Sequence, residues 1–322
     1  MIIAFQQKLL IIISKKILLG SLFILLFNIG WASFAQNISV NSGSARFLVI
    51  SDFGGCASDN QKVVAAAMGK EAKKIRAQFV VTIGDNYHGE RISSENDPRW
   101  KTEFEDIYSA LSLQIPWYAS LGNHDYRGNP EGEIAYSKLS NRWNLPSRYY
   151  IQKEPITDKD SILIVHLDTT PFLEEYHQKE SEYAEHVQGQ DTGKQLKWLD
   201  SVLTVSKACW TMVVGHHPIF SSAPKHGDTK ELVELVLPIL KKHGVRIYAS
   251  GHDHVLQHLK EGDMHFFICG GGANFRDVAE RDDVLFGIGA LGFLSITATK
   301  NELAVNYIGV DNKIINSSVI TK

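Results

Sequence analysis

The sequence predicts an α/β fold, and two patterns support that class. Between residues 46 and 249, short apolar runs rich in Val and Ile alternate with longer segments whose apolar residues recur at helical spacing. Beyond residue 264 the helical spacing stops, and strand-like runs follow one another with tight turns between them. We therefore expect alternating strand and helix units first and an antiparallel section last.

The elements follow from this spacing in chain order. The expected strands of the alternating section are 46–50, 79–83, 116–121, 161–167, 210–214 and 245–249. The expected helices are 61–76, 98–111, 193–205 and 229–243. The final section is expected to contain strands at 265–269, 292–299, 303–308 and 313–320. One segment, 171–191, is long and polar, which is typical of a lid or a disordered excursion.

The first 35 residues resemble a secretory signal peptide. Lys15 and Lys16 precede the apolar run 17–27, and Ser33 and Ala35 are small residues at the expected cleavage site. An uncleaved membrane anchor is the alternative, although this apolar run is short for a membrane span. We expect a signal peptide at 1–35 and one domain at 36–322, so the mature chain would be secreted or periplasmic and would have no membrane contact.

Composition limits the classes of partner and ligand. The net charge of −3 gives no electrostatic reason to expect nucleic acid binding. No pair of cysteines has the spacing of a thiolate metal site. Cys209 and Cys269 are expected to be core thiols, and Cys56 is expected to be a small packed side chain. No segment indicates dimerisation, and we expect a monomer.

Polar clusters follow five of the expected strands, where open α/β sheets bind their ligands. These clusters are Asp52, Asp85, Asn123-His124-Asp125, His216-His217 and His252-Asp253-His254. Each is a weak signal alone, but together they offer the carboxylate, amide and imidazole ligands that suit Fe, Zn or Mn. We expect a site for two metal ions, with Asp85 as the carboxylate that bridges them.

These clusters and their glycines resemble the motifs of a known family, the calcineurin-like metallophosphoesterases. The motifs are Asp52, Gly84-Asp85-Asn86, Gly122-Asn123-His124-Asp125, Gly215-His216 and Gly251-His252-Asp253-His254. The spacing is most similar to the purple acid phosphatases of the small, mammalian-like (tartrate-resistant acid phosphatase) type, and the likeness covers nearly all of the chain from Arg46. It implies a four-layer α/β/β/α sandwich of two mixed sheets, with the dimetal site at the C-terminal loops of the strands.

The resemblance also implies a set of metal ligands. Asp52, Asp85 and His254 would hold the first metal, and Asn123, His216 and His252 would hold the second. The family places a tyrosinate on the first metal, and this chain has His88 at that position. We expect His88 to be a ligand; the alternatives are that it contacts the ligands or that Tyr87 replaces it. The implied cofactor is a binuclear centre of Fe with Fe, Zn or Mn, weakly coloured or colourless because imidazole replaces tyrosinate.

The implied activity is that of an acid phosphatase acting on phosphate monoesters. A hydroxide bound to the two metals would attack phosphorus, because metal binding lowers the pKa of water from about 15.7 to near 7. His124 and His226 are the candidates that protonate the leaving group, and Asp125 is expected to hold His124 in one tautomer. The alternatives are a phosphodiesterase or nucleotide hydrolase of the same superfamily, and a metal-binding module without catalysis.

Overall fold

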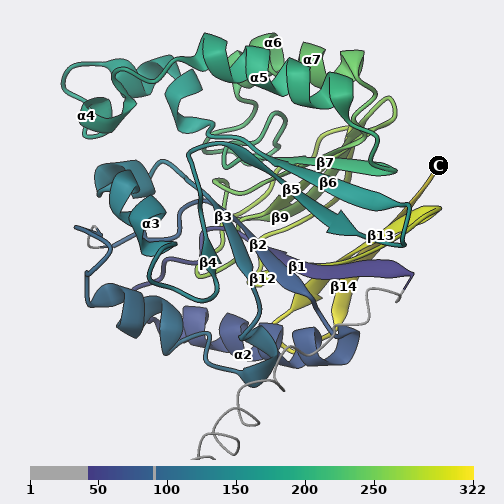
Figure 1. The fold of residues 1–322 in the computed structure, drawn as a ribbon, viewed down its shortest axis with the longest axis horizontal. Coiled ribbons are helices and arrows are strands. Elements are labelled where there is room, and N and C mark those ends of the chain that lie inside the picture. Colours follow the sequence, from purple (N-terminus) through teal and green to yellow (C-terminus); the bar gives the residue numbers. More distant parts are fainter. Residues whose placement is uncertain (1–42, 90–91) are drawn as a thin grey trace, which may run out of the picture. The chain divides into compact units, whose positions relative to one another are not determined.

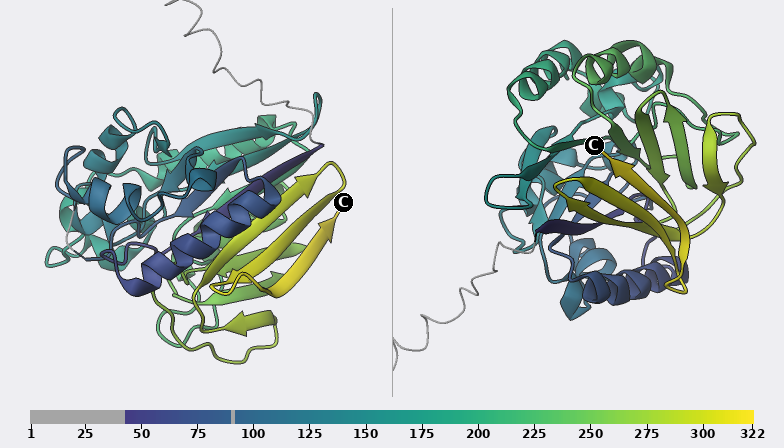
Figure 2. Two further views of the ribbon diagram at one scale, coloured as in Figure 1. Left: turned by 90° about the horizontal axis from the view of Figure 1, so that it is seen from below. Right: turned by 90° about the vertical axis from the view of Figure 1, so that its right-hand side faces the viewer.

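The structure is a computed structural model that describes residues 43–89 and 92–322. The expected signal peptide at 1–35 lies outside the described residues. Two seven-stranded mixed sheets face each other, and helices cover their outer faces (Figures 1 and 2). This arrangement confirms the expected α/β class with two mixed sheets.

The first sheet joins the N-terminal and C-terminal parts of the chain. Its strands, in spatial order, are β14 (Ile314–Thr321), β13 (Glu302–Gly309), β12 (Gly292–Thr299), β1 (Ser44–Ile50), β2 (Phe79–Ile83), β3 (Trp117–Ser120) and β4 (Trp143–Asn144). The strands from β1 to β4 are parallel, and β12 pairs antiparallel with β1. The C-terminal strands therefore extend the sheet that the first parallel units build.

The second sheet takes its strands from the middle of the chain. In spatial order they are β11 (Val284–Ile288), β9 (Leu256–Glu261), β10 (Met264–Cys269), β8 (Ile247–Ser250), β7 (Trp210–Val214), β6 (Ser161–His166) and β5 (Tyr150–Pro155). Strands β6, β7, β8 and β10 are parallel, and β5, β9 and β11 pair antiparallel with their neighbours. The parallel strands thus lie at the centre of the sheet, where both faces are covered.

The helices flank the sheets on opposite sides. They are α2 (Asp59–Ile75), α3 (Pro130–Tyr136), α4 (Ala184–Val187), α5 (Thr192–Val205), α6 (Lys230–Leu235) and α7 (Leu237–Lys242). Helix α2 packs on β1 and β12, and α5, α6 and α7 cover the second sheet (Figure 1). The side chains of Ser58 and Asp191 cap the N-termini of α2 and α5. The expected helix 229–243 is divided into α6 and α7, since Pro238 lacks the N–H that a continuous helix needs.

The core has two layers, which the alternation along β1 illustrates. Phe47 and Val49 belong to the apolar cluster between the two sheets, whereas Leu48 and Ile50 belong to the cluster beneath the helices. Because side chains alternate across a strand, such a continuous apolar run fits a strand that is buried on both faces. Burial on both faces thus holds the strands in place, and the polar clusters lie in the loops that follow the strand ends.

Two local expectations were wrong. The expected helix 98–111 is reduced to a π-helical segment at Trp100–Glu105, and the Arg142 guanidinium donates to the carbonyls of Phe104, Glu105 and Tyr108 around its end. Cys56 is exposed rather than packed, in a turn where its φ angle is +52°. The segment 171–191 forms 3-10 turns and α4, so of its two alternatives the disordered excursion is excluded and the lid stays a prediction.

No helix of residues 43–89 and 92–322 is long and apolar enough to cross a membrane.

Candidate metal centre

The C-terminal ends of parallel strands from both sheets meet at one place. Asp52 follows β1, Asp85 follows β2 and Asn123 follows β3, all from the first sheet. From the second sheet, His216 follows β7, and His252 and His254 follow β8. The structure therefore brings together clusters that lie up to about two hundred residues apart in the chain.

One group of side chains surrounds the first candidate metal position. The ligand atoms of Asp52, Asp85, His88 and His254 all lie within 4.8 Å of one another. His254 Nε2 is 3.2 Å from Asp52 Oδ1, and His88 Nε2 is 2.9 Å from Asp85 Oδ2. Two carboxylates and two imidazoles form a donor set that suits a transition metal.

A second group lies on the other side of Asp85. Asn123 Oδ1 is 3.1 Å from His216 Nε2 and 3.0 Å from His252 Nδ1. His216 Nε2 is 3.3 Å from Asp85 Oδ1, the oxygen that does not approach His88. The two carboxylate oxygens of Asp85 thus face different groups, which is the geometry of a bridging ligand.

His217 lies beside this second group, but its two ring nitrogens are engaged elsewhere. Nδ1 is 2.9 Å from the hydroxyl of Thr169, and Nε2 is 3.2 Å from the hydroxyl of Tyr176. The side chain is fully buried. Asn123, whose oxygen points between two imidazoles, is therefore the better third donor of this group.

Tyr87 and His88 point in different directions. The Tyr87 ring is buried and packs edge-on against Trp100 at 5.2 Å, where its nearest carboxylates are those of Glu133, Glu103 and Asp125. Burial raises the pKa of the Tyr87 phenol well above its usual value, so this side chain stays neutral. His88 lies against Asp85 and is 3.8 Å from Asp52 Oδ1. The structure thus brings His88, and not Tyr87, to the cluster.

The site fits bound cations on two grounds. Asp52 is fully buried, and among the described residues its Oδ1 has no well-aligned hydrogen bond, although His254 Nε2 lies 3.2 Å away. Although burial opposes the ionisation of Asp85, the imidazoles of His216 and His88 hold its pKa well below the usual range. Burial lowers the pKa of His216, but the Asp85 carboxylate outweighs this and raises it to about 9. Protons thus balance the buried carboxylates here, and metal cations supply the same compensation when they replace those protons.

The backbone at the ligands is unusual. Asp52, Asp85, His252 and His254 have φ angles of +55°, +50°, +69° and +44°, in the left-handed region. Gly122 has no room for a side chain, because a Cβ atom there would collide with the backbone nitrogen and carboxylate of Asp85. The loop that contains Gly122 therefore approaches the loop that contains Asp85 more closely than a residue with a side chain would allow.

His124 lies next to the candidate metal positions, but a different residue from the expected one holds its ring. Its Nε2 is 3.9 Å from Asp85 Oδ2, and its Nδ1 accepts a hydrogen bond from Arg127 Nη1 at 3.1 Å. The expectation that Asp125 holds His124 was wrong, because the Asp125 carboxylate binds the backbone N–H groups of Gly122 and Tyr87. Arg127 therefore fixes the tautomer that carries its proton on Nε2. Burial lowers the pKa of His124 to about 4.

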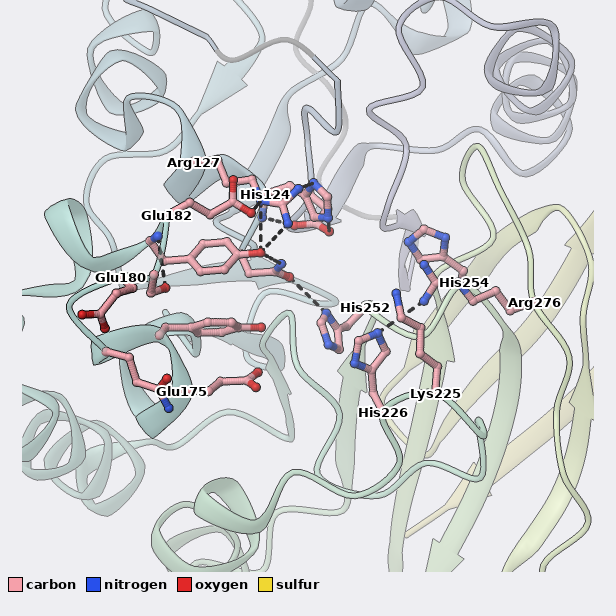
Figure 3. Close-up of a pocket in the computed structure, with 16 residues that line it drawn as sticks. His124, Arg127, Glu175, Glu180, Glu182, Lys225, His226, His252, His254 and Arg276 are labelled. Carbon is pink, nitrogen blue, oxygen red and sulfur yellow. Dashed lines mark hydrogen bonds and ion pairs between the residues drawn. The ribbon is translucent and has the colours of Figure 1, made fainter.

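His226 forms part of the opposite wall. Its ring lies 4.2 Å from that of His252, and Arg276 Nη1 is 3.3 Å from its Nε2. Partial burial and the charges of Lys225 and Arg276 lower its pKa to about 4. Figure 3 shows these side chains on one side of a cavity of about 680 Å³, with His124, Arg127 and Glu182 on the other side.

Two residues of this cavity were not anticipated from the sequence. Arg127 stands two residues after the Asn123-His124-Asp125 cluster, and Tyr183 comes from the 171–191 segment. Because Arg127 is so close to that cluster in the sequence, its presence at the site could have been predicted. Nothing in the local pattern around Tyr183 indicated that its hydroxyl would reach Asn123.

Comparison with known proteins agrees with this geometry. Residues 45–256 match the calcineurin-like phosphoesterase family. The chain is 37% identical over 295 residues to purple acid phosphatase 17 of Arabidopsis thaliana, covering 88% of this chain and 86% of the relative. It is 32% identical over 289 residues to human tartrate-resistant acid phosphatase type 5, covering 83% and 88%.

Two solved structures share the fold. The chain resembles GAP50, described as the anchor in the inner membrane complex of Plasmodium, with a TM-score of 0.76, 24% identity and coverage of 86% of this chain and 89% of that chain. It also resembles the purple acid phosphatase PPD1 of yellow lupin seeds, with a TM-score of 0.62, 16% identity and coverage of 88% and 54%.

Proposed function

This chain belongs to the calcineurin-like phosphoesterase family, and we propose that it is an acid phosphatase that hydrolyses phosphate monoesters at a binuclear metal site. The observation that carries the proposal is the position of Asp85, whose two oxygens face two separate groups of metal-ligand type. Named relatives of 31–37% identity are acid phosphatases, which favours this activity over a phosphodiesterase.

The proposed ligands divide between two metals. Asp52, Asp85, His88 and His254 would hold the first, and Asn123, His216 and His252 would hold the second. When bound, the two metals supply an activated water and neutralise the charge of the phosphoryl oxygens. The proposal for His88 is supported by its contact with Asp85 and by the packing of Tyr87 against Trp100. We propose Fe with Fe, Zn or Mn, and a weakly coloured or colourless protein.

The two other histidines would act on the ester. His124 directs an Nε2 proton toward the cavity because Arg127 donates to its Nδ1, so it can donate a hydrogen bond while it remains neutral. His226 lies across the cavity beside Lys225 and Arg276, where a phosphoryl oxygen or leaving group would meet positive charge. We propose that these two side chains orient the phosphoryl group and support departure of the leaving group.

We further propose that residues 1–35 are a cleaved signal peptide and that 36–322 form the mature, secreted or periplasmic monomer. The Lys15-Lys16 pair, the apolar run and the small residues before Gln36 support this proposal. N-terminal sequencing of the exported protein should begin at Gln36, and light scattering should give the mass of one chain. An N-terminus at Met1 would contradict cleavage.

The activity is tested with an aryl phosphate monoester and the matching diester. We expect the chain from Gln36, loaded with metal, to hydrolyse the monoester in preference to the diester. Asp85→Ala should abolish turnover, whereas Asp311→Ala, in the exposed turn between β13 and β14, should not. Preference for the diester would favour a phosphodiesterase, and no turnover of either ester with two metals bound would refute the proposed activity.

A further inference from the structure

The hydroxyl of Tyr183 reaches the metal centre from outside the motif loops. Tyr183 directly precedes α4, within the 171–191 segment. Its oxygen accepts a hydrogen bond from Asn123 Nδ2 at 3.3 Å. Asn123 is a proposed metal ligand, so this contact joins the segment to the metal centre.

Arg127 holds the same hydroxyl from a second direction. Its Nε and Nη2 donate to the Tyr183 oxygen at 3.0 and 2.6 Å, and its guanidinium carbon lies 5.1 Å from the centre of the ring. The guanidinium also donates to His124 Nδ1 at 3.1 Å and pairs with Glu182 at 2.8 Å. Because its contacts point in several directions, Arg127 leaves Tyr183 little freedom to rotate away.

The hydrogen bonds of Tyr183 leave one group without a protein partner. A phenol oxygen has two lone pairs and one O–H. Asn123 Nδ2 and Arg127 Nη2 donate to this oxygen and fill its two lone pairs, while the single N–H of Arg127 Nε is shared between this oxygen and Glu182; none of these groups can accept a proton. Within residues 43–89 and 92–322, the Tyr183 oxygen makes no other hydrogen bond. In all of these bonds the oxygen accepts, so the hydroxyl proton has no acceptor among the described residues.

The unused O–H belongs to a side chain that lines the cavity together with Asp85, Asn123 and His124. We propose that Tyr183 is a phosphate-binding residue, whose O–H donates to an oxygen of the phosphoryl group that the metals hold. The ligand that this inference assigns is the phosphoryl group of a phosphate monoester, or inorganic phosphate, either of which offers oxygens that accept this O–H. This inference rests on the proposed function, since it assigns a further contact to the same substrate.

The contact between Tyr183 and Asn123 has a second effect. An amide that donates Nδ2–H to Tyr183 must turn its Oδ1 the other way, toward His216 and His252, where it lies 3.1 and 3.0 Å from their nitrogens. Loss of the hydroxyl could thus weaken metal binding as well as phosphate binding. The experiment must separate weaker metal binding from weaker phosphate binding. Measuring at saturating metal achieves this, because both metal positions are then filled in every variant.

The test is Tyr183→Phe, which removes only the hydroxyl. The matched control is Tyr149→Phe, a half-buried tyrosine whose ring packs against Trp198 at 4.8 Å. Each protein is saturated with metal, and its metal content and Tm are recorded. Affinity for inorganic phosphate is measured by calorimetry, and KM and kcat are measured for an aryl phosphate.

A hydrogen bond to a charged group predicts that Tyr183→Phe weakens phosphate binding by about tenfold or more at full metal occupancy. The KM for the ester should rise by a similar factor, with a smaller change in kcat and a retained cooperative melting transition, and Tyr149→Phe should behave as wild type. Unchanged phosphate affinity would overturn the inference. So would a defect that disappears at metal saturation, since Tyr183 would then act only through Asn123. Failure of wild type to hydrolyse esters would refute the proposed function instead, because calorimetry measures phosphate binding without turnover.

Discussion

Replacing Glu133 by Gln should change how stability depends on pH. Glu133 lies on α3 and is fully buried beside Asp125, and the Asn86 amide donates to both carboxyl groups at 3.1 Å. Burial and the neighbouring Asp125 raise the pKa of Glu133 well above its usual value. The folded protein therefore keeps a proton that the unfolded chain releases above about pH 4.5.

The direction and size of the effect follow from this difference. A raised pKa in the folded state contributes stability that is present at low pH and is lost as the pH rises toward the folded-state value. The loss is about 1.4 kcal/mol per pH unit for one proton. Integrated from about pH 5 to about pH 7 with an unfolded-state pKa of 4.5, it comes to as much as about 2.5 kcal/mol. The glutamine side chain of Glu133→Gln does not titrate, so the free energy of unfolding of this variant does not fall for this reason as the pH rises.

The assay is denaturant unfolding of metal-free wild type and Glu133→Gln at about pH 5 and about pH 7. We expect the variant to gain up to about 2.5 kcal/mol on wild type between the two pH values. Glu131→Gln, an exposed glutamate of the same helix that pairs with Arg148, is the matched control and should show no such gain. An equal pH dependence in wild type and Glu133→Gln would show that Glu133 is not protonated in the fold.

Four further outcomes are expected. Gly122→Ala should lower kcat/KM by about a hundredfold or more, because its Cβ collides with Asp85; circular dichroism should show a retained fold. His88→Ala should lose metal on dialysis under conditions in which wild type retains two ions, as elemental analysis would show. Arg142→Met should lower the free energy of unfolding by about 1–3 kcal/mol, because it removes the ion-pair partner of Glu105 and a donor to the buried carbonyl of Tyr108; urea denaturation measures this loss. Chelation should abolish ester hydrolysis, and added metal should restore it; activity that persists in the fully metal-free protein would contradict the binuclear site.

Strand ends were the part of the fold that local sequence could predict. Apolar β-branched runs specify buried strands, and the polar residue after each run has to lie at a sheet edge. That reasoning located Asp52, Asp85 and the histidines of the second sheet without knowledge of strand order. It also found most strands, although β4, β5, β9 and β11 lacked a clear pattern of their own.

Contacts between distant segments were beyond such reasoning. The helix expected at 98–111 has suitable spacing, but a guanidinium more than thirty residues away binds its carbonyls. Asp125 follows His124 directly, yet its carboxylate is turned toward Gly122, Tyr87 and Asn86. Tyr183 contributes its hydroxyl from a segment with no recognisable pattern. In each case the deciding partner is a side chain or backbone group brought in by the tertiary fold.

The left-handed backbone at Asp52, Asp85, His252 and His254 has a consequence for protein engineering. A non-glycine residue in this region costs roughly 1–2 kcal/mol. A stabilisation programme that searches for relaxed backbone angles would select these positions early and replace them with Gly or Asn. The resulting protein would melt at a higher temperature and would have lost proposed metal ligands. Thermostable variants of this chain should therefore be sought at other left-handed residues, such as Arg76 at the C-terminus of α2, which lies outside the metal centre.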